Sequence, residues 1–138
     1  PEAGKTTLIR KVAARLTRRR LGGFYTEEIR RGGAREGFRL VTFDGREAVM
    51  AHTRLPGPPR VGRYGVDVAV IDELTDSALG AGPARDVYLV DEIGKMECFS
   101  RRFVSAVRAL LEERRPVVAT VGARGGGFIA EVTERLDT

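Results

Sequence analysis

The sequence contains one cysteine, one histidine and no tryptophan in 138 residues. The single cysteine, Cys98, cannot form a disulfide within the chain, which favours a reducing compartment and predicts a cytoplasmic location. Zinc sites in proteins are built from clusters of cysteine and histidine. Because the chain has only one residue of each type, we do not expect a zinc site.

Long apolar runs are also missing. No segment approaches the roughly 20 apolar residues that a membrane-spanning helix needs, so we expect no such segment. Internal repeats and low-complexity tracts are absent. What remains is an ordinary globular composition, with 42% hydrophobic and 31% charged residues, which predicts a single soluble domain over residues 1–138.

The chain carries a formal net charge of +5, with 24 lysines and arginines against 19 acidic residues. Such a balance can indicate nucleic-acid binding. Four arginines crowd the end of the first predicted helix, where the helix dipole favours cations: Arg15, Arg18, Arg19 and Arg20. No aromatic residues interleave with them to stack on bases. The charge therefore does not favour nucleic acid as the main ligand.

Residues 1–7 read Pro-Glu-Ala-Gly-Lys-Thr-Thr and match the second half of the phosphate-binding pattern G-x-x-x-x-G-K-[ST]. Gly4 is then the second glycine and Lys5 the phosphate lysine, and the first glycine falls two residues before Pro1. Apolar residues follow at helical spacing, at Leu8, Ile9, Val12, Ala13 and Leu16. Phosphate binds at such a helix N-terminus, because unpaired N–H groups and the helix dipole favour an anion. The alternative is a charged loop that enters a helix; the pattern instead predicts a nucleoside triphosphate as substrate.

A second motif, Val-Tyr-Leu-Val-Asp-Glu at residues 87–92, ends an apolar run in two carboxylates. Short runs of β-branched and aromatic residues are typical of buried parallel strands, and open α/β sheets bind ligands at the C-terminal ends of such strands. Asp91 is therefore expected to hold Mg²⁺, and Glu92 to orient or deprotonate the attacking water. The alternative is an Asp-Glu pair that leaves a strand for a solvated turn.

The other periodicities predict a helix, an antiparallel excursion, and then alternating strands and helices. Strands or extended segments are predicted over residues 24–29, 38–43, 47–52, 66–70, 87–92 and 116–121. Helices are predicted over residues 6–20, 71–79, 101–114 and 128–136. The third has Ser100 as its N-cap and an apolar stripe at Phe103, Val107, Leu110 and Leu111, which predicts a face toward the core.

Several short sequence motifs in the chain occur together in one known protein family. The most specific is Asp-Glu-Ile-Gly-Lys-Met-Glu at residues 91–97. The others lie at residues 23–30, 33–38 and 61–67. Together with residues 1–7 they resemble the small P-loop nucleoside-triphosphatase family, which includes archaeal and bacterial thermophilic nucleoside-triphosphate phosphatases and the animal cancer-related nucleoside-triphosphatase. The resemblance runs from Pro1 to about residue 121.

The resemblance implies an α/β fold of the P-loop NTPase type, with a mostly parallel sheet, helices on both faces and an antiparallel hairpin insertion. It also implies slow, Mg²⁺-dependent hydrolysis of nucleoside triphosphates, ATP and GTP included, to diphosphate and phosphate with broad tolerance of the base. Lys5 and Glu92 would be catalytic, and Thr6 and Asp91 would hold Mg²⁺. The nucleotide-binding residues would be Pro1, Glu2, Ala3, Gly4, Lys5, Thr6, Thr7, Asp91, Glu92, Ile93, Gly94 and Lys95.

Compared with this family, residues 1–138 are expected to form one domain that is truncated at both ends. The family's first strand and its C-terminal segment near the base have no counterpart in the sequence. We expect the missing strand to lie centrally, next to the strand that carries Asp91.

Phosphoryl transfer usually needs a cation besides the P-loop lysine. Arg30, Arg35 and Arg63 lie in family motifs, and one of them could act as an arginine finger. Lys95 is a fourth candidate, and its alternative role is a salt bridge to Glu97 or to another carboxylate at the strand end. Two other functions stay open, a nucleotide-gated binding module and a P-loop kinase of a small acceptor.

Overall fold

The computed structural model describes residues 11, 20–80, 85–122 and 127–136. The predicted P-loop at residues 1–7 and most of the first predicted helix lie outside these ranges. No helix in the described part of the chain is long and apolar enough to cross a membrane.

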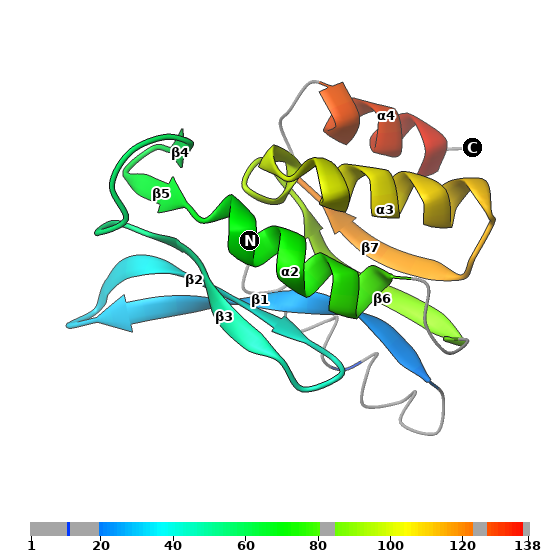
Figure 1. The fold of residues 1–138 in the computed structure, drawn as a ribbon, viewed down its shortest axis with the longest axis horizontal. Coiled ribbons are helices and arrows are strands. Elements are labelled where there is room, and N and C mark those ends of the chain that lie inside the picture. The colour runs from blue at the N-terminus through cyan, green and yellow to red at the C-terminus, as the bar shows by residue number, and fades with distance from the viewer. Residues whose placement is uncertain (1–10, 12–19, 81–84, 123–126, 137–138) are drawn as a thin grey trace.

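The described strands form one mixed, seven-stranded sheet in the order β4-β5-β3-β2-β1-β6-β7 (Figure 1). They are β1 (Leu21–Arg31), β2 (Ala34–Thr42), β3 (Glu47–His52), β4 (Arg60–Val61), β5 (Tyr64–Val66), β6 (Val87–Ile93) and β7 (Val117–Val121). β6 pairs in parallel with β1 and with β7, whereas the pairs from β1 to β4 are antiparallel. The predicted hairpin insertion is therefore continuous with the parallel part of the sheet, because β1 belongs to both.

The position of β6 corrects one expectation. β6 has a neighbour on each side, β1 through residues 21–24 and β7 through residues 117–121. Neither edge of β6 is open, so the expectation that the family's first strand lies beside it is wrong. Within the described sheet, the open edge of the parallel part is at β7.

The described helices are α2 (Val68–Leu79), the short 3₁₀ helix η1 (Glu97–Phe99), α3 (Arg101–Glu112) and α4 (Gly127–Leu136). α2 begins at Val68 because the Asp67 carboxylate accepts a hydrogen bond of 3.2 Å from the Val70 N–H. The prediction that residues 66–70 are extended is therefore wrong after Asp67. Ser100 is confirmed as the N-cap of α3, since its hydroxyl oxygen accepts the Phe103 N–H at 3.0 Å.

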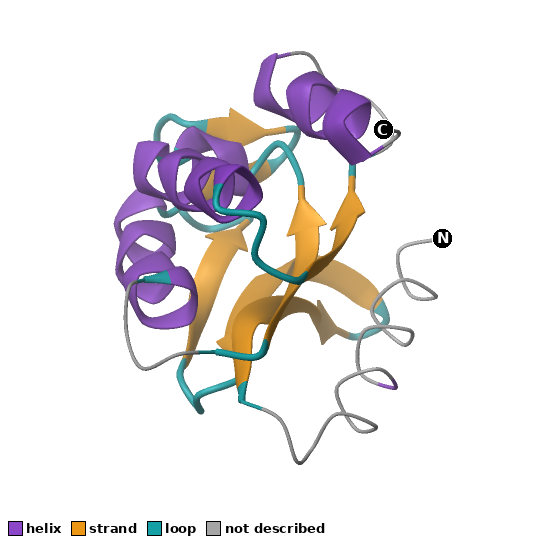
Figure 2. Ribbon diagram, turned by 90° about the vertical axis from the view of Figure 1, so that its right-hand side faces the viewer, coloured by secondary structure: helices purple, strands orange, loops and turns teal. Residues whose placement is uncertain are grey.

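Helices α2 and α3 cover one face of the sheet (Figures 1 and 2). Phe103, Val107 and Leu110 of the predicted apolar stripe are buried in α3, whereas its fourth member, Leu111, is only partly buried. The Phe103 ring meets Phe24 of β1 edge-on, with ring centres 5.8 Å apart. Full burial of such a side chain contributes about 1.5 to 3 kcal/mol, so this layer stabilises β1 in its place beside β6.

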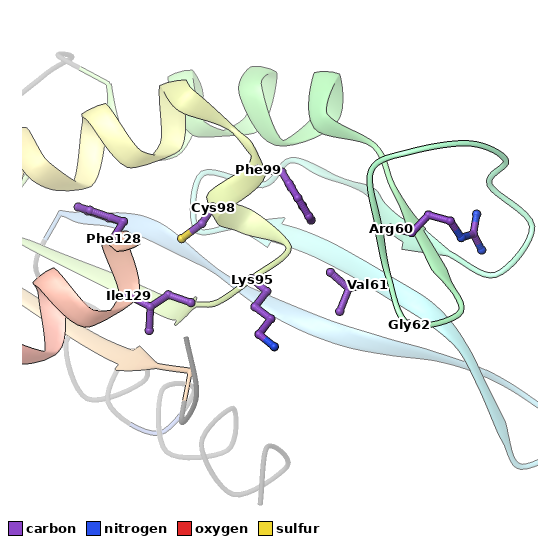
Figure 3. Close-up of a pocket in the computed structure, with 8 residues that line it drawn as sticks. All are labelled: Arg60, Val61, Gly62, Lys95, Cys98, Phe99, Phe128 and Ile129. Atoms are coloured by element: carbon purple, nitrogen blue, oxygen red, sulfur yellow. The ribbon is translucent and has the colours of Figure 1, made fainter. Parts of the chain in front are cut away.

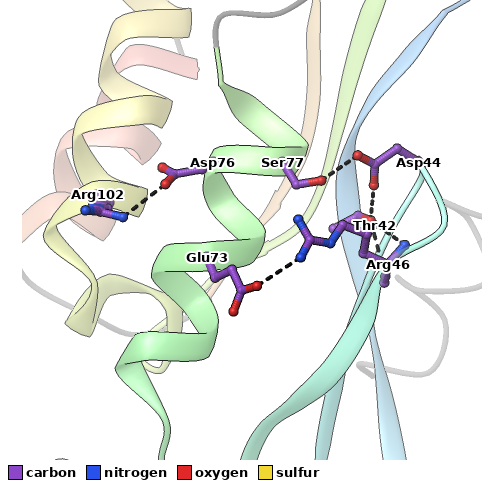
Figure 4. A network of polar contacts seen from close by, with 7 residues as sticks. All are labelled: Thr42, Asp44, Arg46, Glu73, Asp76, Ser77 and Arg102. Atoms are coloured by element: carbon purple, nitrogen blue, oxygen red, sulfur yellow. Dashed lines mark hydrogen bonds and ion pairs between the residues drawn. The ribbon is translucent and has the colours of Figure 1, made fainter.

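Polar contacts join α2 to the turn between β2 and β3 (Figure 4). Asp44 accepts hydrogen bonds from the hydroxyls of Ser77 and Thr42. Burial opposes the charged form of Asp44, but these hydrogen bonds and the Arg85 charge hold the pKa of Asp44 below its ordinary value. Exposed ion pairs join further side chains of this layer, namely Arg46 with Glu73 and Arg102 with Asp76. The insertion is therefore attached to the helix layer.

Gly23 lies where β1 meets β6. Its φ is +98°, and a Cβ there would overlap the Leu89 carbonyl oxygen. We expect Gly23→Ala to lower the free energy of unfolding by about 3 kcal/mol, because the backbone conformation and the strand contact both become strained. Gly33→Ala is the matched control, since its φ of +81° is similar but no atom lies within 4 Å of the added Cβ. Urea unfolding measures both variants. If Gly23→Ala and Gly33→Ala lost the same free energy of unfolding, the close contact of Gly23 with the Leu89 carbonyl would be contradicted.

Candidate active site

Asp91 and Glu92 lie close to the C-terminal end of β6, which ends at Ile93. Asp91 is 3% exposed, and its carboxylate accepts a hydrogen bond of 2.6 Å from the Thr120 hydroxyl of β7. Because β6 and β7 are parallel, their ends meet at the same edge of the sheet, where open α/β folds hold ligands. The alternative interpretation, in which Asp91 lies in a solvated turn, is therefore wrong.

Glu97, in the first position of η1, is a third carboxylic acid near this edge. Its side chain is buried, and its carboxylate accepts hydrogen bonds from its own backbone N–H and from the backbone N–H of Glu92. Burial, with the nearby charges of Glu92 and Asp91, raises the pKa of Glu97 to about 8. Glu97 therefore holds the main chain at Glu92 and is mostly protonated at neutral pH.

Gly94 separates the two glutamate side chains. A Cβ at this position would lie 2.8 Å from Glu92 Oε1 and 3.2 Å from Glu97 Oε1. Any residue with a side chain at position 94 would therefore collide with these carboxyl groups. The glycine in the Asp-Glu-Ile-Gly string is explained by this close approach.

The raised pKa of Glu97 predicts a pH-dependent stability. The unfolded chain ionises Glu97 near its ordinary pKa of 4.5, whereas the native protein keeps the proton to about pH 8, so the native state binds more protons between these values. Stability from this group is complete below about pH 4.5 and is lost as the pH rises through about 8.

Glu97→Gln should therefore flatten the pH dependence of the free energy of unfolding. We expect the loss between about pH 5 and pH 8 to be smaller in Glu97→Gln than in the wild type, by a difference on the order of a few kcal/mol. Urea unfolding in EDTA measures it without interference from bound Mg²⁺. Identical pH profiles for the two proteins would show that Glu97 ionises normally.

Beyond Gly94 the chain borders a pocket of about 460 Å³ (Figure 3). It is lined by Arg60, Val61, Gly62, Lys95, Cys98, Phe99, Phe128 and Ile129. Burial, with the charge of Glu97, raises the pKa of the Cys98 thiol to about 12, so this thiol is not a nucleophile at neutral pH. Within the described part of the chain, no ion pair joins Lys95 to Glu97, so the salt bridge considered for Lys95 is not formed.

The three candidate arginine fingers belong to the antiparallel insertion. Arg30 lies about 20 Å along β1 beyond the last residue that pairs with β6. Its guanidinium donates to Glu28 at 2.8 Å and to the Gly33 carbonyl at 3.1 Å. Arg35 forms a 3.5 Å ion pair with Glu28, and Arg63 donates to the Arg35 carbonyl at 2.7 Å. An arginine finger among these residues stays a prediction.

Of the predicted nucleotide-binding residues, the structure places the second group, residues 91–95, on one strand end and the turn that follows it. The first group, Pro1, Glu2, Ala3, Gly4, Lys5, Thr6 and Thr7, lies outside the described residues. No cluster of three or more His, Cys, Asp or Glu among the described residues could hold a metal ion. Mg²⁺ usually takes one or two carboxylates together with substrate phosphates and water, so the buried Asp91 fits such a site.

Sequence reasoning did not assign a role to Thr120 or to the buried Glu97 carboxyl. Thr120 is a polar residue near the end of the apolar run at residues 116–121, and that break in the pattern is the signal that could have identified it. The sequence predicted Glu97 only as an ion-pair partner of Lys95, because nothing in the order of residues 94–97 indicates that its carboxyl group lies against Glu92.

Comparison with known proteins gives concordant matches. The family model described as NTPase matches residues 1–138. The chain is 41% identical over 138 residues to the nucleoside-triphosphatase THEP1 of Thermotoga maritima, which covers 99% of this chain and 78% of the relative. It is 39% identical to the human cancer-related nucleoside-triphosphatase, over 97% of this chain and 77% of the relative.

Two solved structures resemble the fold. The crystal structure of THEP1 from Aquifex aeolicus matches with a TM-score of 0.83 and 36% identity, over 94% of this chain and 77% of that chain. The solution structure of a human cancer-related nucleoside triphosphatase matches with a TM-score of 0.77 and 36% identity, over 96% of this chain and 79% of that chain.

Proposed function

Since the chain belongs to the nucleoside-triphosphatase family and hydrolyses nucleoside triphosphates, we propose that its reaction is slow, depends on Mg²⁺ and tolerates different bases, ATP and GTP among them. The observation that best supports this proposal is Asp91, a buried carboxylate oriented by Thr120 directly beside Glu92 at the ligand edge of the sheet. We also propose that residues 1–138 belong to one domain and that the protein is cytoplasmic.

Each proposed role follows from the chemistry of its residue. Backbone N–H groups near Gly4 and the Lys5 ammonium would bind the phosphates, and Thr6 with Asp91 would hold the metal. Mg²⁺, when bound, withdraws charge from the phosphate oxygens. Glu92 accepts a hydrogen bond from the attacking water. This hydrogen bond turns a lone pair of the water oxygen toward the γ-phosphorus. Hydrolysis then yields diphosphate and phosphate.

Glu97 and Thr120 contact the two acids of the site, Glu92 and Asp91. The Glu97 carboxyl accepts the Glu92 backbone N–H, and the Thr120 hydroxyl donates to Asp91, so each acid of the pair has a fixed neighbour. The Asp91 carboxylate, held in this way, need not reorganise when charge develops on the phosphate, and such preorganisation is the main source of electrostatic catalysis.

Asp91→Asn tests the metal role. The Thr120 hydroxyl can still donate to the amide oxygen, so the fold should survive, but the negative charge toward Mg²⁺ is lost. We expect the Mg²⁺ concentration for half-maximal turnover to rise by about 10-fold or more, in addition to a slower rate. The exposed Asp76→Asn is the control and should leave the Mg²⁺ dependence unchanged. An unchanged Mg²⁺ titration in Asp91→Asn would remove Asp91 from the metal site.

A further inference from the structure

The 460 Å³ pocket beside the active site has the volume of a small-molecule site. Three segments far apart in the sequence line it: β4 with the turn that follows it, the residues after β6, and the start of α4 (Figure 3). Neither Asp91 nor Glu92 is among the lining residues. The pocket therefore adjoins the catalytic edge but is separate from its two acids.

The walls of this pocket are mainly apolar. Val61, Phe128 and Ile129 contribute to them, and Phe99 is 42% exposed, which is unusual for a phenylalanine. In Figure 3 the Phe99 ring points toward the space that Val61 and Lys95 also border. An exposed aromatic face in a concave site favours stacking with a flat ligand.

Lys95 and Arg60 both bring a positive charge to the pocket. Arg60 also lines the pocket, but its guanidinium donates to the carbonyls of Leu55 and Arg63, at 2.8 Å and 2.7 Å. Lys95 lines the pocket and has no hydrogen bond or ion pair to any residue that the structure describes. The Cys98 thiol stays neutral, so among the described lining residues no anionic group opposes the Lys95 ammonium.

We propose that this pocket binds a small organic anion that carries an aromatic ring, with the ring against Phe99 and Val61 and the anionic group at Lys95 Nζ. The ligand is distinct from the triphosphate that is hydrolysed, so in this proposal Lys95 serves that ligand in place of the nucleotide-binding role expected from the sequence. Lys95 and Phe99 belong to the same short segment as Gly94 and Glu97, so an occupant would contact the segment that holds Glu92 in place. The binding claim depends on the pocket alone and not on the proposed reaction.

The test is a titration of the ¹⁵N-labelled protein with 1-naphthalenesulfonate, followed in two-dimensional amide NMR spectra. We expect saturable shifts at Val61, Gly62, Lys95, Phe99 and Ile129. The neutral 1-naphthalenemethanol should bind about 10-fold more weakly, because it lacks the charge-assisted contact to Lys95. Phe99→Ala should weaken sulfonate binding about 10-fold, whereas Val49→Ala, an exposed apolar residue on β3, should not.

Four outcomes would overturn the proposal: no saturable shifts, shifts centred elsewhere, equal affinity for the neutral compound, or equal affinity in Phe99→Ala. Complete displacement of the sulfonate by saturating Mg²⁺-nucleotide would also overturn it, since the pocket would then be part of the triphosphate site. Because no turnover is measured, failure of the proposed reaction cannot produce any of these results.

Discussion

Glu92→Gln is expected to lower the rate of nucleoside-triphosphate hydrolysis by about 10² to 10⁴ while leaving Mg²⁺-nucleotide binding almost unchanged. The amide keeps the size of the carboxylate and most of its hydrogen bonds, but it cannot accept a proton from water. A rate loss of that size corresponds to roughly 2.7 to 5.4 kcal/mol of barrier. Steady-state phosphate release and fluorescence titration with a labelled nucleotide separate the two effects.

The control for Glu92→Gln is its thermal unfolding. Glu92 is only partly buried at the end of β6, so the variant should melt close to the wild type, and the rate loss should not reflect unfolding. Full activity in Glu92→Gln would refute Glu92 as the residue that activates water. Glu97 would then be the next residue to test.

Gly94→Ala should reduce turnover by about 10² with little loss of stability. The added methyl group would lie 2.8 Å from Glu92 Oε1 and 3.2 Å from Glu97 Oε1, so it must push a carboxylate aside. Glu97 is buried and cannot move outward, so the partly exposed Glu92 side chain is displaced. A shift of about 1 Å in a catalytic group can cost about 10² in rate.

Gly122→Ala is the matched control for Gly94→Ala. Gly122 lies just after β7 at the same edge, but the nearest atoms to an added Cβ are 3.6 Å away, which is an ordinary contact. We expect turnover within about twofold of the wild type in this variant. If Gly94→Ala were as active as Gly122→Ala, the positions of the two glutamates around Gly94 would not matter for catalysis.

Local features of the fold were predictable from the sequence because they depend on neighbouring residues. The stripe at Phe103, Val107 and Leu110 predicted the buried face of α3, and the Ser100 cap was read from the residue before it. The strand that carries Asp91 was predicted from its apolar run. In contrast, Asp67 was not recognised as a cap, so the start of α2 was placed too late.

Features that depend on distant pairing were not predictable. The neighbours of β6 are decided by contacts between segments tens of residues apart, so the expected position of the family's first strand was wrong. The same holds for the hydrogen bond from Thr120 to Asp91. Sequence alone also could not tell that Glu97 is buried near Glu92 while Lys95, two residues earlier, is exposed and lines the pocket.

The central claim is that water, activated at the Asp91 and Glu92 edge, attacks the γ-phosphorus of a nucleoside triphosphate. Hydrolysis by the full-length protein in ¹⁸O-labelled water tests it most directly, with the products read by ³¹P NMR. The account predicts nucleoside diphosphate without label and inorganic phosphate with one labelled oxygen, for ATP and GTP alike and only when Mg²⁺ is present. Label in the diphosphate, release of pyrophosphate, or phosphate that appears only when a small acceptor is added would contradict it.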